Sequence, residues 1–137
     1  MSSVTLINSE KIKTILYLEF EGVCGIGSDS NIDCDKILEI AVDRVEKFNG
    51  CQGLIFDFRS MNYQFGNRFL RLFNTNNIKR NKYFPISIIT TSENIENWRS
   101  LIEYASLDIE FLNVEKAVFH LEFQSAISSI RRRLNKK

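Results

Sequence analysis

The sequence has 137 residues, of which 44% are hydrophobic and 26% are charged, and its formal net charge is +1. A chain of this length can bury its own hydrophobic core, so we expect one domain over residues 1–137, and the composition excludes a disordered or collagen-like chain. No apolar run approaches the ~20 residues that span a bilayer, and the first residues lack the pattern of a signal peptide. A cytoplasmic protein outside the membrane is therefore expected.

The first half of the chain predicts a β-hairpin followed by a helix. Residues 4–7 and 14–20 mix apolar and β-favouring residues on either side of a polar stretch at residues 9–11, which indicates two paired strands. Over residues 33–48, apolar side chains recur at helical spacing. Residues 49–50, an Asn-Gly pair, supply the signal that ends this helix.

The second half predicts strands that alternate with helices. Strands are expected at residues 54–58, 85–90, 109–112 and 117–119, and helices at residues 67–76, 95–105 and 123–134. The last of these helices has a clear apolar side, which includes Ala126, Ile127 and Ile130. This alternation is typical of an α/β domain with parallel strand pairs and right-handed crossovers.

Two parts of the chain carry a resemblance to a known family. One is the apolar strand at 54–58, which holds Asp57 and is followed by a polar loop at 60–63 and a helix that begins near Gly66. The other is the strand at 118–120 with the helix behind it. In these segments and in the order of its elements, the chain resembles the STAS domain, named for sulfate transporters and anti-sigma factor antagonists. The resemblance implies a central mixed sheet with an N-terminal hairpin and about four helices, in a signalling protein that regulates by binding another protein. The scarcity of proline and the many Asn, Ile and Lys residues indicate a bacterial source.

The resemblance also implies where a partner binds. In signalling members of the family, the second helix opens with an aspartate and serines, and phosphorylation of one serine switches partner binding. Residues 64–67 of this chain hold neither an aspartate nor a hydroxyl, and Ser60 lies too early to replace them. We therefore expect a divergent, non-enzymatic relative without the phosphorylation switch, because an amide cannot accept a phosphate. The partner-binding residues expected by similarity are Asn62, Tyr63, Gln64, Phe65, Gly66, Asn67, Arg68 and Arg71.

The charge pattern favours a partner with an acidic surface. Residues 58–92 hold six basic residues and no acidic one. If folding leaves this segment unopposed by the acidic parts of the chain, it forms a positive patch that speeds encounter with an acidic protein. Nucleic acid is not the expected partner, because the pI is only about 7.7 and no RNA-binding or helix-turn-helix signature is present.

No set of side chains predicts catalysis, a metal site or a cofactor. His120 is the single histidine, and its place on an expected strand indicates a core or rim residue. Cys24, Cys34 and Cys51 lack C-x-x-C spacing, which favours small buried thiols over a disulfide or a zinc site. Asp57 has no visible partner and, at the end of a strand, is expected to accept hydrogen bonds from loop amides.

The loop from Gly22 to Ser30 is the other place where chemistry could be sought. Its glycines fit neither the G-x-G-x-x-G nor the P-loop spacing, so a turn with Ser30 and Asp33 as a capping box is expected. Two alternative functions stay open, a binder of a small ligand or nucleotide that uses this loop and a small inhibitor or immunity-type protein. Self-association into a homo-oligomer also stays open.

Overall fold

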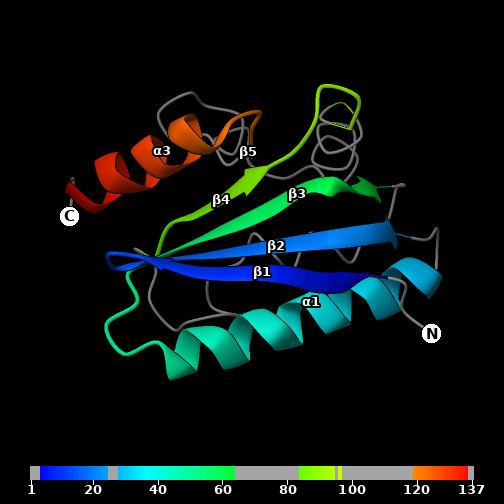
Figure 1. The fold of residues 1–137 in the computed structure, drawn as a ribbon, viewed down its shortest axis with the longest axis horizontal. Helices are drawn as coiled ribbons and strands as arrows, with labels where there is room; N and C mark the ends of the chain where they lie inside the picture. Colours follow the sequence, from blue (N-terminus) through cyan, green and yellow to red (C-terminus); the bar gives the residue numbers. More distant parts are fainter. Residues whose placement is uncertain (1–3, 25–27, 64–83, 95, 97–118, 136–137) are drawn as a thin grey trace.

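The computed structural model describes residues 4–24, 28–63, 84–94, 96 and 119–135. Within these ranges the chain forms a sheet with a helix on each side (Figure 1). In chain order the elements are β1 (Thr5–Ile12), β2 (Ile15–Cys24), α1 (Ser28–Lys47), β3 (Gly53–Tyr63), β4 (Ile86–Ile89), β5 (Phe119–His120) and α3 (Phe123–Asn135).

The five described strands lie side by side in the order β1-β2-β3-β4-β5. The β1–β2 pair is antiparallel, and each later neighbour pair is parallel, so the sheet is mixed. This arrangement confirms the expected mixed α/β sheet with an N-terminal hairpin. Between the parallel neighbours β2 and β3 the chain crosses over through α1, as a parallel connection requires.

The hairpin turn lies further along the chain than the sequence indicated. Residues 9–11 belong to β1, and the strands close at the pair Ile12 and Ile15 around Lys13 and Thr14. Lys13 adopts a positive φ of 56°, which a tight two-residue hairpin requires at one of its central positions. The polar residues of β1 were misleading because an edge strand with an exposed face carries polar side chains without leaving the sheet.

Helix α1 begins earlier than expected, at Ser28 instead of Asp33. Ser30 therefore lies inside the helix, and the expected capping box of Ser30 and Asp33 is wrong. The loop expected from Gly22 to Ser30 is wrong at both ends, because β2 runs to Cys24 and α1 begins at Ser28. The end of the helix is as expected: α1 stops at Lys47, and Gly50 follows with a φ of +85°.

Strand β3 is longer than expected. It runs from Gly53 to Tyr63, so the predicted polar loop at residues 60–63 is wrong. Met61 explains the difference, because its side chain is buried in the core and its backbone pairs with Gly22 of β2. The polar residues on either side of Met61 face outward, which made a strand with one exposed face look like a loop.

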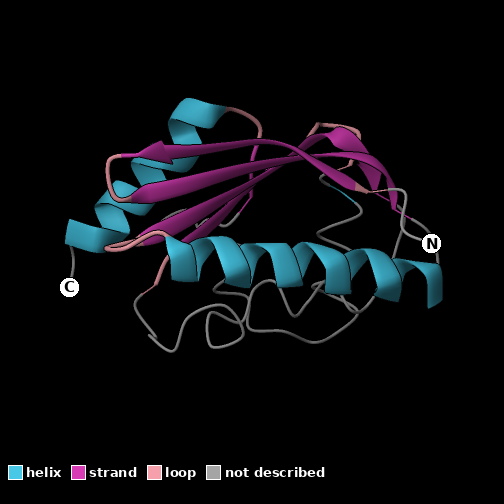
Figure 2. Ribbon diagram, turned by 60° about the horizontal axis from the view of Figure 1, so that its bottom comes forward, coloured by secondary structure: helices cyan, strands magenta, loops and turns pink. Residues whose placement is uncertain are grey.

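The sheet has two differently built faces, which we name by the helix that covers each (Figure 2). On the α1 face, buried apolar residues of β2, β3 and β4 pack against residues of α1 that include Ile37, Ala41 and Val45. On the α3 face, a smaller core joins Ile15, Ile55 and Ile89 to the buried residues of α3. The apolar side predicted for the last helix is thus confirmed.

Arg133 fastens α3 to β4. Its Nη2 donates to the Ser87 hydroxyl at 2.8 Å and to the Ile86 carbonyl at 3.1 Å, and the Ser87 hydroxyl lies 3.3 Å from the Ala126 carbonyl of the helix. Burial, and then the charge of Arg132, lowers the pKa of Arg133 to about 10. One of the three consecutive arginines therefore binds the sheet, while its two neighbours are exposed.

Some expected elements lie outside the described residues. The helices predicted at residues 67–76 and 95–105 fall there apart from Glu96, and so does the strand predicted at 109–112. The strand predicted at 85–90 is confirmed as β4, and β5 with α3 confirms the order expected for the end of the chain. None of the described helices combines the length and the hydropathy that crossing a membrane would take.

Candidate functional site

The site expected from the resemblance begins at the end of β3. Asn62 is exposed on the last part of the strand, and Tyr63 is its final residue. The other expected partner-binding residues, Gln64, Phe65, Gly66, Asn67, Arg68 and Arg71, lie outside the described residues. Most of the predicted surface therefore stays a prediction, and its described edge is the end of β3.

The end of β3 is braced by the turn that follows β4. Asn94 Nδ2 donates to the Met61 carbonyl at 3.3 Å, and the Asn94 N–H is held by the Thr91 carbonyl and hydroxyl at 3.1 and 3.2 Å. Because β3 and β4 are parallel, their carboxyl ends meet at one edge of the sheet, which is where open α/β sheets usually bind ligands. Asn62 is thus presented next to a fixed backbone.

A buried ionic network of Tyr17, Asp57 and Arg59 lies earlier in β3 and on the neighbouring β2, on the α3 face. The carboxylate of Asp57 is fully buried. It accepts a hydrogen bond from the Tyr17 hydroxyl, and Arg59 donates to it from Nη2 at 2.8 Å, from Nε at 3.1 Å and from its backbone N–H at 3.0 Å. Both carboxylate oxygens therefore have donors, as a buried charge requires.

The network fixes the protonation of its members. Burial by itself raises the pKa of the Asp57 carboxyl, but the hydrogen bonds from Arg59 and Tyr17 and the Arg59 charge outweigh burial and hold that pKa below its usual range. Burial and the neighbouring Asp57 carboxylate raise the pKa of the Tyr17 hydroxyl well above its usual value. The Asp57 hydrogen bond raises the pKa of Arg59. At neutral pH the three groups are an ion pair and a neutral phenol.

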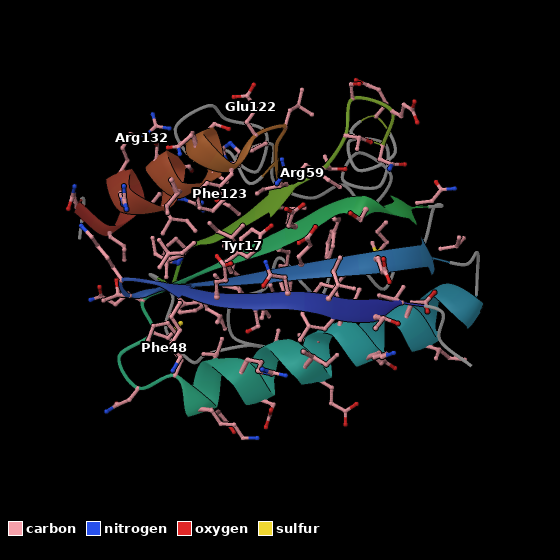
Figure 3. The ribbon with its side chains drawn as sticks, viewed as in Figure 1. Tyr17, Phe48, Arg59, Glu122, Phe123 and Arg132 are labelled. Atoms are coloured by element: carbon pink, nitrogen blue, oxygen red, sulfur yellow. The ribbon has the colours of Figure 1, made fainter. Side chains whose placement is uncertain are left out.

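The network connects a buried position to the surface. The Tyr17 ring meets the Phe123 ring of α3 edge-on, with centroids 5.7 Å apart, and Figure 3 shows both on the same side of the sheet as Arg59. The Arg59 side chain is 43% exposed, although its carboxylate partner is buried. Arg59 is therefore a cation whose position is set from inside the protein and whose outer part is open to solvent.

The strand register extends this site across the sheet. Glu19, Asp57, Ile89 and His120 are neighbours on four adjacent strands, and such neighbours point to the same face. His120 is 8% exposed, which confirms the expected buried position. The expectation for Asp57 needs correction, because it lies within β3 and its partners are two side chains and one amide two residues away, not a loop.

The Asp57 network anchors side chains to one another. The Asp57 carboxylate is buried and already bonded by Tyr17 and Arg59, so it is not poised to move a proton. Over the described ranges, no three His, Cys, Asp or Glu side chains lie close enough together to hold a metal ion. Cys34 and Cys51 are buried thiols outside any disulfide, as their spacing predicted.

The amino-acid sequence contains a signal for this network, although the pairing was not predicted from it. Asp57 and Arg59 are two positions apart on a strand, so they share a face, and Tyr17 lies in the other strongly apolar strand. An acid and a base at this spacing inside an apolar strand indicate a mutual ion pair, because an isolated buried charge is too costly.

Comparison with known proteins bears on the fold. No family model and no curated protein sequence matches the chain. Among solved structures, it is similar to the crystal structure of an anti-sigma factor antagonist from Mycobacterium paratuberculosis, with a TM-score of 0.60 over 96% of this chain and 99% of that chain. The chain has a STAS-like fold. Because the two sequences are only 13% identical, the similarity extends to the fold and not to individual site residues.

Proposed function

We propose that this STAS-like domain is a non-catalytic regulatory module that binds a protein partner through the end of β3 and the residues that follow it, from Asn62 to Arg71. The observation that carries the proposal is the braced end of β3, where exposed Asn62 follows buried Met61 and Asn94 bonds the Met61 carbonyl. A fixed backbone at Met61 and Asn62 lowers the entropy cost of binding there, because these two residues do not have to be ordered when the partner arrives.

The partner's surface is acidic in this proposal. Residues 58–92 hold six basic residues and no acidic one. Arg59 is paired with Asp57 and contributes little net charge, so the proposed attraction rests on the later basic residues, of which Arg68 and Arg71 follow β3 first in the sequence. Opposite charges across an interface mainly raise the association rate and select the partner.

Binding is not switched by phosphorylation in this proposal. Residues 64–67 have no hydroxyl group. Ser60 is exposed but lies within β3, paired with Glu21 of β2, so it does not occupy the start of a helix. A phosphate there would face an acidic neighbour on the adjacent strand and would be repelled.

The test uses a charge reversal with a matched control. Arg68→Glu with Arg71→Glu reverses two charges in the proposed surface, and Arg131→Glu with Arg132→Glu reverses two exposed charges on α3. All three proteins are immobilised, and partners from a cell lysate of the source organism are identified by mass spectrometry at low and moderate salt. Circular dichroism and thermal unfolding show whether each variant is folded.

We expect a stoichiometric protein that binds the native chain and the α3 control but not the Arg68/Arg71 variant. Retention of that protein by a folded Arg68/Arg71 variant would contradict the proposed surface. The proposed absence of a phosphorylation switch is checked by the intact mass of the domain recovered from the same cells. A phosphorylated species would contradict this part of the proposal.

A further inference from the structure

A second candidate site lies on the α1 face, between the hairpin and the end of α1. A pocket of about 390 Å³ is lined there by Ser9 and Lys11 of β1, by Arg44 and Lys47 of α1, and by Phe48. Figure 3 places Phe48 at the end of α1, across the sheet from Arg59. The pocket is therefore separate from the end of β3 and from the Asp57 network.

The pocket carries an excess of positive charge. Lys47 is paired with Asp43 at 3.1 Å, which is the acidic residue of the lining. The Lys11 ammonium lies 5.1 Å from the centre of the Phe48 ring, a cation–π contact that does not neutralise its charge. Arg44 is exposed and has no carboxylate partner among the described residues. Within the part of the chain that the structure describes, two cations therefore face the pocket without an acidic partner.

The pocket adjoins an edge of the described sheet. β1 is the outermost strand of the described sheet. Ile12 and Ile15 close a two-residue hairpin as a hydrogen-bonded pair, and hydrogen-bonded pairs then alternate with non-hydrogen-bonded pairs along the two strands. Lys11 and Ser9 fall in the non-hydrogen-bonded pairs, so their backbone N–H and C=O groups point away from β2. These are the same two β1 residues whose side chains line the pocket. An added strand would lie ~4.8 Å further out, with alternate side chains on the α1 face beside the pocket.

We propose that the β1 edge and this pocket bind an extended acidic segment of a partner protein as an added strand. The backbone of the segment pairs with Ser9 and Lys11, and acidic side chains at alternate positions meet Lys11 and Arg44. Main-chain pairing supplies affinity in this mode of recognition, and the side-chain pocket supplies specificity. This surface is independent of the proposed interface at the end of β3.

The test uses short fluorescent peptides and measures binding to the whole chain by anisotropy. The probe alternates Glu with Thr, one control replaces each Glu with Lys, and another carries N-methyl groups on the amides that would face β1. We expect the Glu peptide to bind and each control to bind at least roughly tenfold more weakly. Equal binding of the methylated and unmethylated Glu peptides would overturn strand addition, because the methyl groups remove the donors that the ladder needs.

Protein variants locate the site. Lys11→Glu with Arg44→Glu should weaken binding of the Glu peptide at least roughly tenfold. Arg131→Glu with Arg132→Glu, the same change of net charge on exposed α3 residues, should leave it within about twofold, because these charges lie on another element. Arg68→Glu with Arg71→Glu should also bind the peptide, which separates this proposal from the one for the end of β3.

Two further outcomes would overturn the proposal. One is the absence of binding to the native chain up to about 1 mM peptide, a concentration that detects even weak recognition. The other is a dimer in sedimentation experiments that Lys11→Glu with Arg44→Glu dissociates, since a second copy of the chain would then occupy the edge.

Discussion

The two faces of the sheet are made by the same strands but rely on different interactions. On the α1 face, β3 contributes Leu54, Phe56 and Phe58, all buried among apolar neighbours. On the α3 face, the residues between and beyond them include buried Asp57 and half-exposed Arg59. The α1 face is stabilised by buried apolar area and close packing. The α3 face adds an ion pair, which stabilises the fold only while Asp57 and Arg59 keep their hydrogen-bonding geometry.

This difference shows that one strand can both stabilise the core and hold a partly exposed side chain, Arg59, in place. Side chains alternate along β3 from Leu54 to Phe58, so a change on one face there leaves the other face in place. A substitution in the α1 face alters apolar packing and no charged group. The α3 face, in contrast, positions Arg59 near the end of β3. Substitutions on each face should therefore differ in size and in their dependence on pH.

The largest effect is expected on the α1 face. Phe56 is fully buried between Phe20 and Phe58, with ring centroids 6.4 and 5.5 Å away. Phe56→Ala should lower the free energy of unfolding by about 3–5 kcal/mol at every pH, because it leaves a cavity in a close-packed core. Urea denaturation measures the loss. Ile7→Ala, at a position that is 44% exposed, is the control, and an equal loss in both variants would contradict the assignment of the core.

The next effect is expected on the α3 face. Asp57→Asn should cost about 2–3 kcal/mol, less than for a fully buried pair because Arg59 can turn toward water. The loss should depend on pH. Because the pKa of Asp57 is lowered below its ordinary value of 3.8 in the folded state, the stability it contributes is present above that value and is lost as the pH falls through the folded-state pKa. Urea denaturation at neutral and acid pH measures both effects.

The free energies of unfolding of the native chain and of Asp57→Asn should converge as the pH falls into the acid range. Glu10→Gln, which removes an exposed carboxylate from β1, is the matched control and should lose little stability at either pH. A difference between Asp57→Asn and the native chain that stayed constant down to acid pH would show that the charge of Asp57 is not what the α3 face depends on.

A smaller effect is expected where β3 meets α3. A Cβ atom added at Gly53 would lie 2.8 Å from Ile130 Cγ2, which is closer than two such atoms can approach. Gly53→Ala should therefore destabilise the fold by about 1–2 kcal/mol through displacement of the helix. Thermal unfolding of Gly53→Ala, Ile130→Ala and the double variant checks this. The two losses should not add, because the smaller side chain at 130 makes room, and strict additivity would refute the clash.

The smallest effect is expected at the end of α3. Arg133→Met keeps the aliphatic stem but removes the bonds to Ser87 and to the Ile86 carbonyl, so it should cost about 1 kcal/mol. Arg132→Met, at an exposed neighbour, should change stability by less than about 0.5 kcal/mol. Chemical denaturation of both variants gives the comparison, and an equal loss would mean that the loss of charge near the helix end, and not the bond to β4, is what matters.

The sequence predicted the elements that have a strong period or composition. The hairpin, the helix with Ile37 and Ala41 on its buried side, strand β4 and the last helix were each recognisable from their patterns. The sequence failed at element ends. Polar residues such as Ser60 and Asn62 were interpreted as a loop, although they occupy the exposed positions of a strand that pairing with β2 extends.

The candidate site was predicted in outline only. The end of β3 was located by resemblance, and its described edge is Asn62 and Tyr63. The brace from Asn94 to the Met61 carbonyl was not predicted, because it joins residues 33 positions apart. The pocket at Phe48 was also missed, since it forms only where Lys11 and Arg44 come together from β1 and α1.

The sequence by itself determined the α/β class and the buried sides of α1 and α3, because these follow from spacing along a single segment. The tertiary structure alone decided which segments became neighbours. The Tyr17 hydroxyl reaches Asp57 across 40 positions of the chain only because β2 and β3 pair in parallel in one particular register. A shift of that register by one residue would turn Asp57 into the apolar α1 face, where a charge without a partner is too costly to bury.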